Sequence, residues 1–353
     1  MPRTVMIRRL LFSVILLALA ATGVSVMALH SVWRQPVMLP QGSAVITIAP
    51  GESLGGVLAR AEVNSWLKRA SWVGLVARWL QLDQQIKAGE FLLESPLTAG
   101  EMIELLAAGQ VLQHTVTLPE GITLEEAISK IQEHPKVRVT PHDELVGALL
   151  DLTARSDTAE GLFLPETWAF TAGDRDFDIL RRAHLAMMKL VDSLWDDRIP
   201  TLPFASPYEA IVLASIVEKE TGVPAERAQI AGVFVRRLRR GMRLQTDPTV
   251  IYGLGSTYDG NLTRRDLKDS SNGYNTYVIP ALPPTPISLP GEDALRAVFS
   301  PDDSAALYFV AKGDGSHAFS QSLAEHEANV RRFQLNRRAD YRSTRTTLDA
   351  EDG

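Results

Sequence analysis

Cysteine is absent from the 353 residues of this chain. Its absence excludes disulfide bonds, thiolate nucleophiles and zinc sites built on cysteine, and it is compatible with an oxidising compartment. An excess of basic residues is also lacking, because the formal net charge at neutral pH is −6. Without a long basic stripe to neutralise phosphate groups, the chain is not expected to bind nucleic acid as its main partner.

Several catalytic patterns are missing as well. The sequence has neither a Ser-His-Asp arrangement nor a nucleophile elbow, so a serine hydrolase is not expected. No glycine-rich loop suits a phosphate group. One polar group, formed by His317, Glu325, His326 and Asn329, lies towards the C-terminus. Its spacing is not that of a metal-ligand set, so we expect structural hydrogen bonding there and predict neither a metal ion nor a cofactor.

Charge is also missing from a long segment near the N-terminus. Residues 10–33 contain no Asp, Glu, Lys or Arg, and residues 10–29 alone are long enough to cross a bilayer at about 1.5 Å per residue. Arg3, Arg8 and Arg9 precede this segment. The positive-inside rule then predicts that residues 1–9 are cytoplasmic and that the rest lies outside the inner membrane, in the periplasm.

The same apolar segment could instead be a cleaved signal peptide, with Ala18-Leu19-Ala20 as the cleavage site. Its apolar run is longer than the apolar core of a signal peptide, which typically has roughly 7–15 residues. We therefore predict a retained, single-pass membrane anchor over residues 10–33, with Trp33 at the membrane interface.

The remaining sequence predicts an α+β protein with two folded parts. A short linker containing Pro36 and Pro40 is expected at 34–44. Residues 45–118 show a strand pattern, helical patterns and a second strand pattern, which indicates a small α+β module. A larger mixed α+β domain is expected over 119–340, and the polar residues 341–353 are expected to form a disordered tail.

One predicted helix places a carboxylate directly after an apolar run. The segment 206–222 (SPYEAIVLASIVEKETG) offers Ser206 as N-cap, Pro207 at the first helical position and Glu209 to complete a capping box. Gly222 suits a left-handed residue just past the helix end. Residues 211–217 are almost wholly apolar, and Glu218 follows at once.

Helical phase separates Glu218 from Glu220. At about 100° per residue, Glu218 lies on the side of Ala214 and Ser215, whose small side chains would leave room for a ligand. Glu220 lies on the far side. Partial burial and the negative end of the helix would both raise the pKa of Glu218, as a general acid requires. The alternative is a surface carboxylate that pairs with Lys219 or with an arginine of the next helix.

Two later segments carry amides, hydroxyls and aromatic rings. These groups suit carbohydrate, because a sugar offers hydroxyls to bond and an apolar ring face to stack. A turn at 245–248 and an edge strand at 274–277 would explain the same residues without a ligand. The candidate substrate-binding residues are Gln245, Asp247 and Tyr252 in the first segment, and Tyr274, Asn275 and Tyr277 in the second.

A series of short motifs runs in order along the chain from about Val45 to Arg332. Each motif is weak alone, but the ordered set, combined with one N-terminal anchor, resembles the MltG/YceG family of endolytic murein transglycosylases. The motifs are APGESL at 49–54, LPEG at 118–121, EGLFLPETW at 160–168, LASIVEKETG at 213–222, RLQTDPTVIYGLG at 243–255, YNTY at 274–277, LPPTPI at 282–287, LYFVA at 307–311, and the later GSHAFS and EHEANV.

The resemblance implies a LysM-like module at 45–118 and a catalytic domain after it. It places the family's catalytic glutamate at Glu218 and its cleft-lining loops on the six candidate substrate-binding residues. The implied substrate is the glycan strand of peptidoglycan, whose length the enzyme would limit during cell-wall synthesis. Cell-wall synthases (penicillin-binding proteins) are the implied partners. The sequence departs from the family pattern at Arg236, Ala281, Thr285 and Leu289, which bears on the shape of a loop rather than on the reaction.

The implied reaction cuts the β-1,4 bond between N-acetylmuramic acid and N-acetylglucosamine with one carboxyl group instead of the usual two. Glu218 would protonate the leaving oxygen and then take the proton of the muramic acid 6-hydroxyl, which attacks its own C1 and forms a 1,6-anhydro end. Glu220 is the alternative acid. Asp247 as a second carboxylate would make the enzyme a muramidase, and a membrane-anchored scaffold would bind glycan without cutting it.

Overall fold

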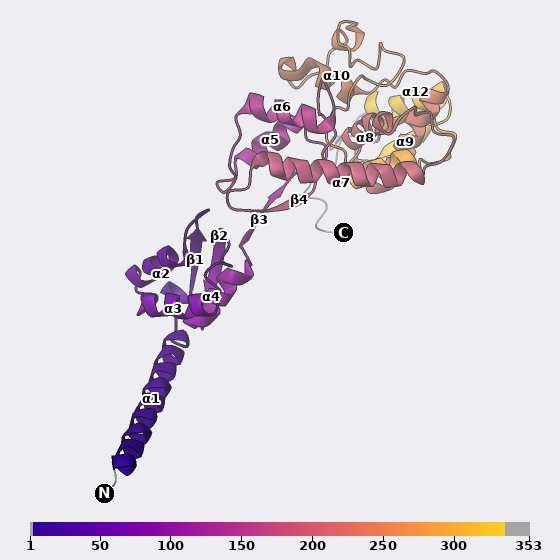
Figure 1. Cartoon of the computed structure of the whole chain (residues 1–353). Helices are drawn as coiled ribbons and strands as arrows, with labels where there is room; N and C mark the ends of the chain where they lie inside the picture. Colours follow the sequence, from indigo (N-terminus) through magenta and orange to yellow (C-terminus); the bar gives the residue numbers. More distant parts are fainter. Residues whose placement is uncertain (1–2, 336–353) are drawn as a thin grey trace. The chain divides into compact units, whose positions relative to one another are not determined.

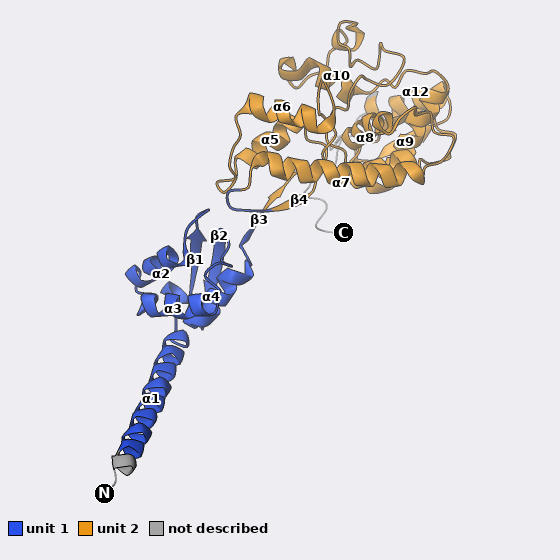
Figure 2. Cartoon of the chain, in the orientation of Figure 1, with its two compact units in different colours: residues 1–114, 170–173 blue, residues 115–169, 174–353 orange. Residues whose placement is uncertain are grey.

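The computed structural model describes residues 3–335. The chain forms two compact units, which Figure 2 distinguishes by colour: unit 1 contains residues 1–114 and 170–173, and unit 2 contains residues 115–169 and 174–353. Helices and short strand pairs alternate along the chain, which confirms the mixed α+β class. The tail predicted at 341–353 lies outside the described residues.

Unit 1 begins with the long apolar helix α1 (Arg3–Trp33), drawn in indigo in Figure 1. Its stretch Ile7–Trp33 contains an 18-residue window with a mean hydropathy of 2.4 and is long and apolar enough to cross a membrane. A membrane anchor and a signal sequence share these properties, so the helix is consistent with either.

The rest of unit 1 packs three helices against one antiparallel strand pair. Ser53 caps the first of these helices, and Thr98 caps the third in a capping box with Glu101. Large apolar side chains such as Phe91 and Met102 are fully buried between the strands and the helices. The elements are a 3-10 turn (Pro40–Gly42), β1 (Ser43–Ile48), α2 (Leu54–Val63), α3 (Ala70–Trp79), β2 (Gly89–Glu94), which pairs with β1, and α4 (Ala99–Ala108).

The stretch that was expected to be a linker at 34–44 is hydrogen-bonded to this module. The Val37 N–H donates to the Leu97 carbonyl at 2.8 Å, and the Ala99 N–H donates to the Gln35 carbonyl at 2.9 Å. Val32, in the last turn of α1, is 6% exposed and belongs to the hydrophobic core of unit 1. Helix α1 therefore continues into the module without a free spacer.

The end of α1 also lies very close to α4. The indole ring of Trp33 rests against Gly100, where an added Cβ would be 2.2 Å from the indole Nε1. Because no side chain fits at that distance, the contact requires glycine at this position of the helix.

Unit 2 is mainly helical and is organised around α8 (Pro207–Glu220), whose residues 210–217 are all buried. Helices α7, α9, α10 and α11 pack against it. Strands β3 (Gln113–Thr117) and β4 (Thr167–Thr171) pair with each other, and the boundary between the units falls within both of them. Strands β5 (Tyr308–Ala311) and β6 (His317–Ser320) form a hairpin. The remaining elements are α5 (Leu124–Gln132), α6 (His142–Thr153), α7 (Asp176–Asp196), α9 (Pro224–Arg239), α10 (Asp247–Leu254), the short turns Gly255–Thr257 and Asp266–Lys268, α11 (Glu292–Phe299), α12 (Leu323–Val330) and the last helical turn Arg331–Leu335.

The start of α8 agrees in part with the sequence prediction. Ser206 is the N-cap, and its Oγ accepts a hydrogen bond from the Glu209 N–H at 3.4 Å. The Glu209 carboxylate accepts from the Ala205 N–H at 2.7 Å. The Glu209 carboxylate thus accepts from the residue before the N-cap and not from the Ser206 N–H, so the expected capping box is not formed.

The end of α8 differs from the prediction. The helix stops at Glu220, and Thr221 is extended, with a φ of −146°. Gly222 has no positive φ, so the expected left-handed residue is wrong. The Thr221 hydroxyl accepts from the Val223 N–H at 2.9 Å. This bond stabilises the short turn into α9 without a left-handed glycine.

Replacing Gly100 by alanine is expected to destabilise unit 1 by about 1–3 kcal/mol, because the new Cβ would displace the indole of Trp33. Urea unfolding of the full chain in detergent would measure the loss. Gly147→Ala in α6 is the matched control: nothing lies within 4 Å of its Cβ position, so it should gain up to about 1 kcal/mol of helix propensity. Equal stabilities of the two variants would contradict the close packing at Gly100.

Candidate functional site

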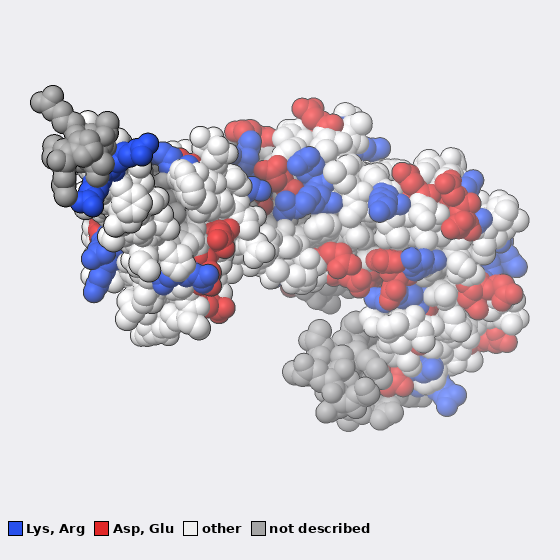
Figure 3. Space-filling view, turned by 60° about the horizontal axis from the view of Figure 1, so that its bottom comes forward, with Lys and Arg blue, Asp and Glu red and all other residues white. Residues whose placement is uncertain are grey.

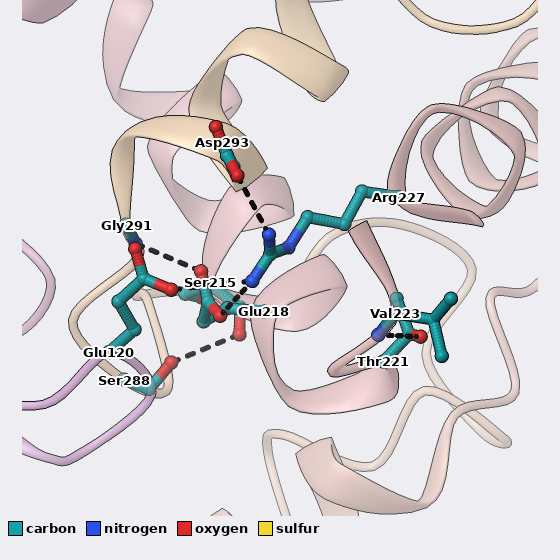
Figure 4. Close-up of polar contacts among 9 residues, drawn as sticks. All are labelled: Glu120, Ser215, Glu218, Thr221, Val223, Arg227, Ser288, Gly291 and Asp293. Carbon is teal, nitrogen blue, oxygen red and sulfur yellow. Dashed lines mark hydrogen bonds and ion pairs between the residues drawn. The ribbon is translucent and has the colours of Figure 1, made fainter. Parts of the chain in front are cut away.

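Glu218 lies in the last turn of α8 and its carboxylate is held from two sides (Figure 4). The Gly291 N–H donates to its Oε2 at 2.9 Å, and a guanidinium nitrogen of Arg227 is 3.4 Å from its Oε1. The side chain of Glu218 is only 5% exposed. Both contacts favour a carboxylate that can carry a negative charge although it is shielded from water.

Arg227, in the first turns of α9, is shared by three carboxylates. Its guanidinium is 3.0 Å from Asp293 in α11, 3.3 Å from Glu120 and 3.4 Å from Glu218. Figure 4 shows the three acids converging on this side chain. Arg227 is 10% exposed, whereas Glu120 and Asp293 are 44% and 63% exposed. One positive charge cannot neutralise three carboxylates, so the group as a whole favours binding a proton.

The burial of Glu218 is the main cause that raises its pKa above the ordinary value, and the negative charge of Glu120 acts in the same direction. The hydrogen bond from Gly291 and the charge of Arg227 oppose this rise. The predicted direction is therefore confirmed. The predicted alternative, a pair with an arginine of the next helix, is also present. Glu218 is both a carboxyl with a raised pKa and a member of an ion pair.

The space expected beside Ala214 and Ser215 is filled. Both residues are fully buried. The Ile287 N–H donates to the Ser215 Oγ at 3.0 Å, and the Ser288 hydroxyl donates to the Ser215 carbonyl at 3.1 Å. The prediction that these small residues leave room for a ligand is wrong, because the 286–291 segment crosses this face of α8 and occupies it.

Glu220 has a different set of neighbours. Its carboxylate accepts a hydrogen bond from the Thr246 hydroxyl, and burial raises its pKa to about 7, with the charge of Asp247 adding to the rise and that of Arg237 opposing it. None of these groups contacts Glu218. The predicted separation of Glu218 from Glu220 by helical phase is therefore confirmed.

The tyrosines of the two candidate segments take part in two sets of contacts, and Asp247 and Tyr252 lie in α10. The Tyr277 hydroxyl donates to Asp247 at 2.6 Å. The rings of Tyr252 and Tyr274 meet edge to face at 4.9 Å between centroids, and the Tyr274 hydroxyl lies 2.8 Å from that of Thr285. Residues 274–277 form turns, so the predicted alternative of an edge strand is wrong.

Gln245 and Asn275 are engaged by the protein itself. The Gln245 side-chain oxygen lies 3.4 Å from the guanidinium of Arg237, and its backbone is left-handed, with a φ of +54°. Asn275 is fully buried, and its amide donates to the carbonyls of Asp266 and Asp269 at 3.1 and 2.9 Å. In this arrangement the Asn275 amide stabilises the loop before Tyr277.

Glu160 is a buried carboxyl that was not among the predicted site residues. It accepts hydrogen bonds from the Leu124 N–H at 3.0 Å and from the Gly161 N–H at 3.2 Å, and Tyr252 donates to it at 3.4 Å. Burial raises its pKa to about 7. Segment 120–124 thus contacts Glu160 at one end and Arg227 at the other. In the sequence, the only indication that these two acids belong to the site was their position in family motifs: Glu160 lies in EGLFLPETW and Glu120 lies in LPEG.

The C-terminal polar group is held by internal contacts. The His317 Nδ1 lies 2.7 Å from the buried Glu226 carboxylate, the His326 ring stacks on Tyr308 at 5.2 Å, and the Asn329 amide donates to Ser320 at 3.0 Å. Among the described residues, no group of three His, Asp or Glu side chains has a geometry that would hold a metal ion.

Residues 46–332 match the YceG-like family, and this match covers most of the chain. The chain belongs to the YceG-like family. A Bacillus subtilis protein named endolytic murein transglycosylase is 36% identical over 170 residues, which are 47% of this chain and 46% of that protein. A Streptococcus pneumoniae protein of the same name is 26% identical over 327 residues, which are 83% of this chain and 57% of that protein.

A solved structure is also similar. The crystal structure of a YceG-like protein from Listeria monocytogenes aligns with a TM-score of 0.52 and 26% identity, covering 82% of this chain and 99% of that one. The present chain spans only 46% to 57% of the length of the curated relatives that it matches.

Three positions at which this YceG-like chain departs from the expected motifs have clear structural contacts. Arg236 donates to the carbonyls of Asp302 and Ala306, both at 2.7 Å. The Thr285 hydroxyl bonds to that of Tyr274, and Leu289 is fully buried. Thr285 and Leu289 thus belong to the loop that leads over α8, whereas Arg236 joins α9 to the segment 302–306.

Glu160→Gln should remove part of the pH dependence of stability. Because the folded pKa of about 7 lies above the ordinary 4.5, the folded state holds this proton more tightly. The resulting stabilisation is complete below about pH 4.5 and is lost as the pH rises to about 7, a change of at most about 3 kcal/mol. Thermal unfolding between pH 4.5 and 8 should show a flatter profile for the variant. The exposed Glu144→Gln is the control; identical profiles for all three proteins would contradict the burial argument.

Proposed function

We propose that this chain is an endolytic murein transglycosylase, which cleaves the β-1,4 bond between N-acetylmuramic acid and N-acetylglucosamine and leaves 1,6-anhydro ends. Membership in the YceG-like family and the names of the curated relatives support the proposal. The observation that carries it is the state of Glu218: a shielded carboxyl with a raised pKa, held between a backbone N–H and a guanidinium.

In the proposed reaction, Glu218 acts first as acid and then as base. Protonated Glu218 gives its proton to the glycosidic oxygen as the bond to the muramic acid C1 breaks. The Gly291 N–H and Arg227 then stabilise the carboxylate that remains. This carboxylate takes the proton of the 6-hydroxyl as that oxygen attacks C1 of the same sugar. Protons balance, no water is consumed, and one carboxyl is sufficient.

The remaining acids of the cluster would set the protonation of Glu218. Glu120 raises its pKa and so favours the acid form before the reaction, whereas Arg227 stabilises the ionised form after it. The two influences bring the two protonation states closer in free energy. A group that must both give and take a proton in one turnover needs this balance.

The sugar contacts are proposed to come from the two loops. Tyr252, Tyr274 and Tyr277 offer ring faces and hydroxyls, and Gln245 and Asp247 offer polar groups beside them. Asn275 is proposed to act by shaping this loop, because its amide is already bonded to two carbonyls.

The location is part of the proposal. Helix α1 is proposed to be a retained anchor in the inner membrane, with the N-terminus inside and both units in the periplasm. The α+β module of unit 1, with two strands and three helices, is proposed to be LysM-like. Cell-wall synthases of the penicillin-binding protein class are the proposed partners, and shortening of growing glycan strands is the proposed role.

Glu218→Gln should lower the rate of anhydro-end formation by about 10²-fold or more, because a carboxamide cannot transfer the proton. Mass spectrometry of muropeptides from digested peptidoglycan measures these ends, which are one water lighter than hydrolytic ends. Glu220→Gln, in the same helix turn but facing other neighbours, should keep the reaction. Loss of activity in Glu220→Gln alone would refute the assignment. Reducing ends would indicate a muramidase, and binding without any products would indicate a scaffold.

Glu120→Gln should shift the pH–rate profile. Removing this negative charge lowers the pKa of Glu218. Glu218 then loses its proton at lower pH, so the alkaline limb of the profile shifts to lower pH. Initial rates of anhydro-end formation across the pH range would show the shift. The exposed Glu144→Gln is the control, because Glu144 pairs with Arg175 and not with Arg227. An alkaline limb that does not move in Glu120→Gln would contradict the role given to Glu120.

A further inference from the structure

Helix α3 in unit 1 carries an exposed apolar stripe. Trp72, Leu75 and Trp79 are 53%, 53% and 82% exposed. Their spacing of three and four residues places them on one side of the helix. Val73 and Ala77, which are fully buried, belong to the side that packs on the module. Helix α3 is therefore apolar on two sides, and residues 3–335 cover only one of them.

This helix lies where α1 enters the module. Helix α3 packs against α1, and Figure 1 shows both α3 and α4 at the end of the module that α1 reaches. A twenty-residue span that begins at Leu10 ends at Leu29. Val32, one turn later, is already in the core of unit 1. The fold therefore brings α3 to the level at which α1 would leave a bilayer.

The hydrogen bonds after α1 make this placement rigid. The Val37 N–H bonds to the Leu97 carbonyl and the Ala99 N–H to the Gln35 carbonyl, while Trp33 rests against Gly100. No free segment separates the span from the module, so unit 1 cannot move away from the membrane surface while α1 remains inserted.

The charges around the stripe are mainly basic, and one of them, Arg78, pairs with Asp83 at 3.7 Å. Residues 65–82 contain Lys68, Arg69 and Arg78, all exposed, and no Asp or Glu. In Figure 3 the left-hand part of the view has wide uncharged areas bordered by both basic and acidic side chains, whereas charges of both signs are interspersed over the right-hand part. Tryptophan with flanking basic residues is typical of segments that lie at the headgroup level of a bilayer.

We propose that α3 lies in the outer headgroup interface of the membrane that α1 crosses, with Trp72, Leu75 and Trp79 inserted among the lipids and the three basic residues among anionic headgroups. The proposed partner surface is lipid rather than a second copy of the chain, because α3 packs against α1 at the end where the proposed span joins unit 1. The inference rests on α1 being a retained anchor and is independent of the transglycosylase reaction.

The cysteine-free sequence allows a direct test with single labels. The full chain is reconstituted in vesicles of phosphatidylcholine and phosphatidylglycerol, with a fluorophore on Leu75→Cys and with brominated lipid as the quencher. Leu185→Cys in α7 is the matched control, because Leu185 is 55% exposed and Leu75 is 53% exposed. Val14→Cys reports insertion of α1. We expect several-fold stronger quenching at position 75 than at position 185, and strong quenching at position 14.

Quenching at position 14 with equal, weak quenching at positions 75 and 185 would overturn the proposal. Energy transfer between labels at position 75 of different molecules, without quenching by lipid, would assign the stripe to a second copy and would also overturn it. Trp79→Cys provides an independent label on the stripe. Replacing Trp72 and Trp79 together by serine should reduce the quenching at position 75 at least two-fold and leave that at position 14 unchanged.

Discussion

The contact between Arg227 and its three carboxylates is the interaction on which the candidate site depends. Glu218 ends a fully buried stretch of α8, where an unpaired carboxylate would be strongly unfavourable. Arg227 and the Gly291 N–H compensate for the lost water. Because the same guanidinium also binds Glu120 and Asp293, it connects α8, α9, α11 and the segment before α5 at one point.

The cluster would also allow a single carboxyl to serve in both steps of the proposed reaction. Burial and Glu120 favour the protonated form of Glu218, and Arg227 and Gly291 favour the ionised form. Burial also raises the pKa values of Glu160 and Glu220, but each has its own partners, Tyr252 and Thr246 respectively. The three carboxyls in unit 2 whose pKa values are raised by burial would seem to offer the pair that a hydrolase uses. Their contacts instead separate them into three environments, of which only that of Glu218 contains an arginine within contact distance of the carboxylate.

Unit 1 combines an apolar helix with a small module, and no flexible linker separates the two. Residues 35 and 37 form backbone hydrogen bonds with Ala99, the first residue of α4, and with Leu97 just before it. The Trp33 ring fits against α4 only because Gly100 has no side chain. Under the proposed role of α1 as a membrane anchor, this rigid joint would hold the exposed stripe of α3 at the bilayer surface. If a flexible linker joined α1 to the module, the position of the same tryptophans relative to α1 would not be fixed.

Local patterns in the sequence were sufficient for the mixed α+β class, the apolar α1, the Ser206 cap, the separation of Glu218 from Glu220 and the raised pKa of Glu218. Each follows from periodicity, capping chemistry or burial within about one helix. Tertiary structure alone determined that the 286–291 segment fills the space beside Ser215, that Thr221 and not Gly222 ends α8, and that Glu120, Arg227 and Asp293 meet at Glu218. Those contacts join residues up to 107 positions apart. Their pairing depends on how helices pack, which no local pattern of side chains encodes.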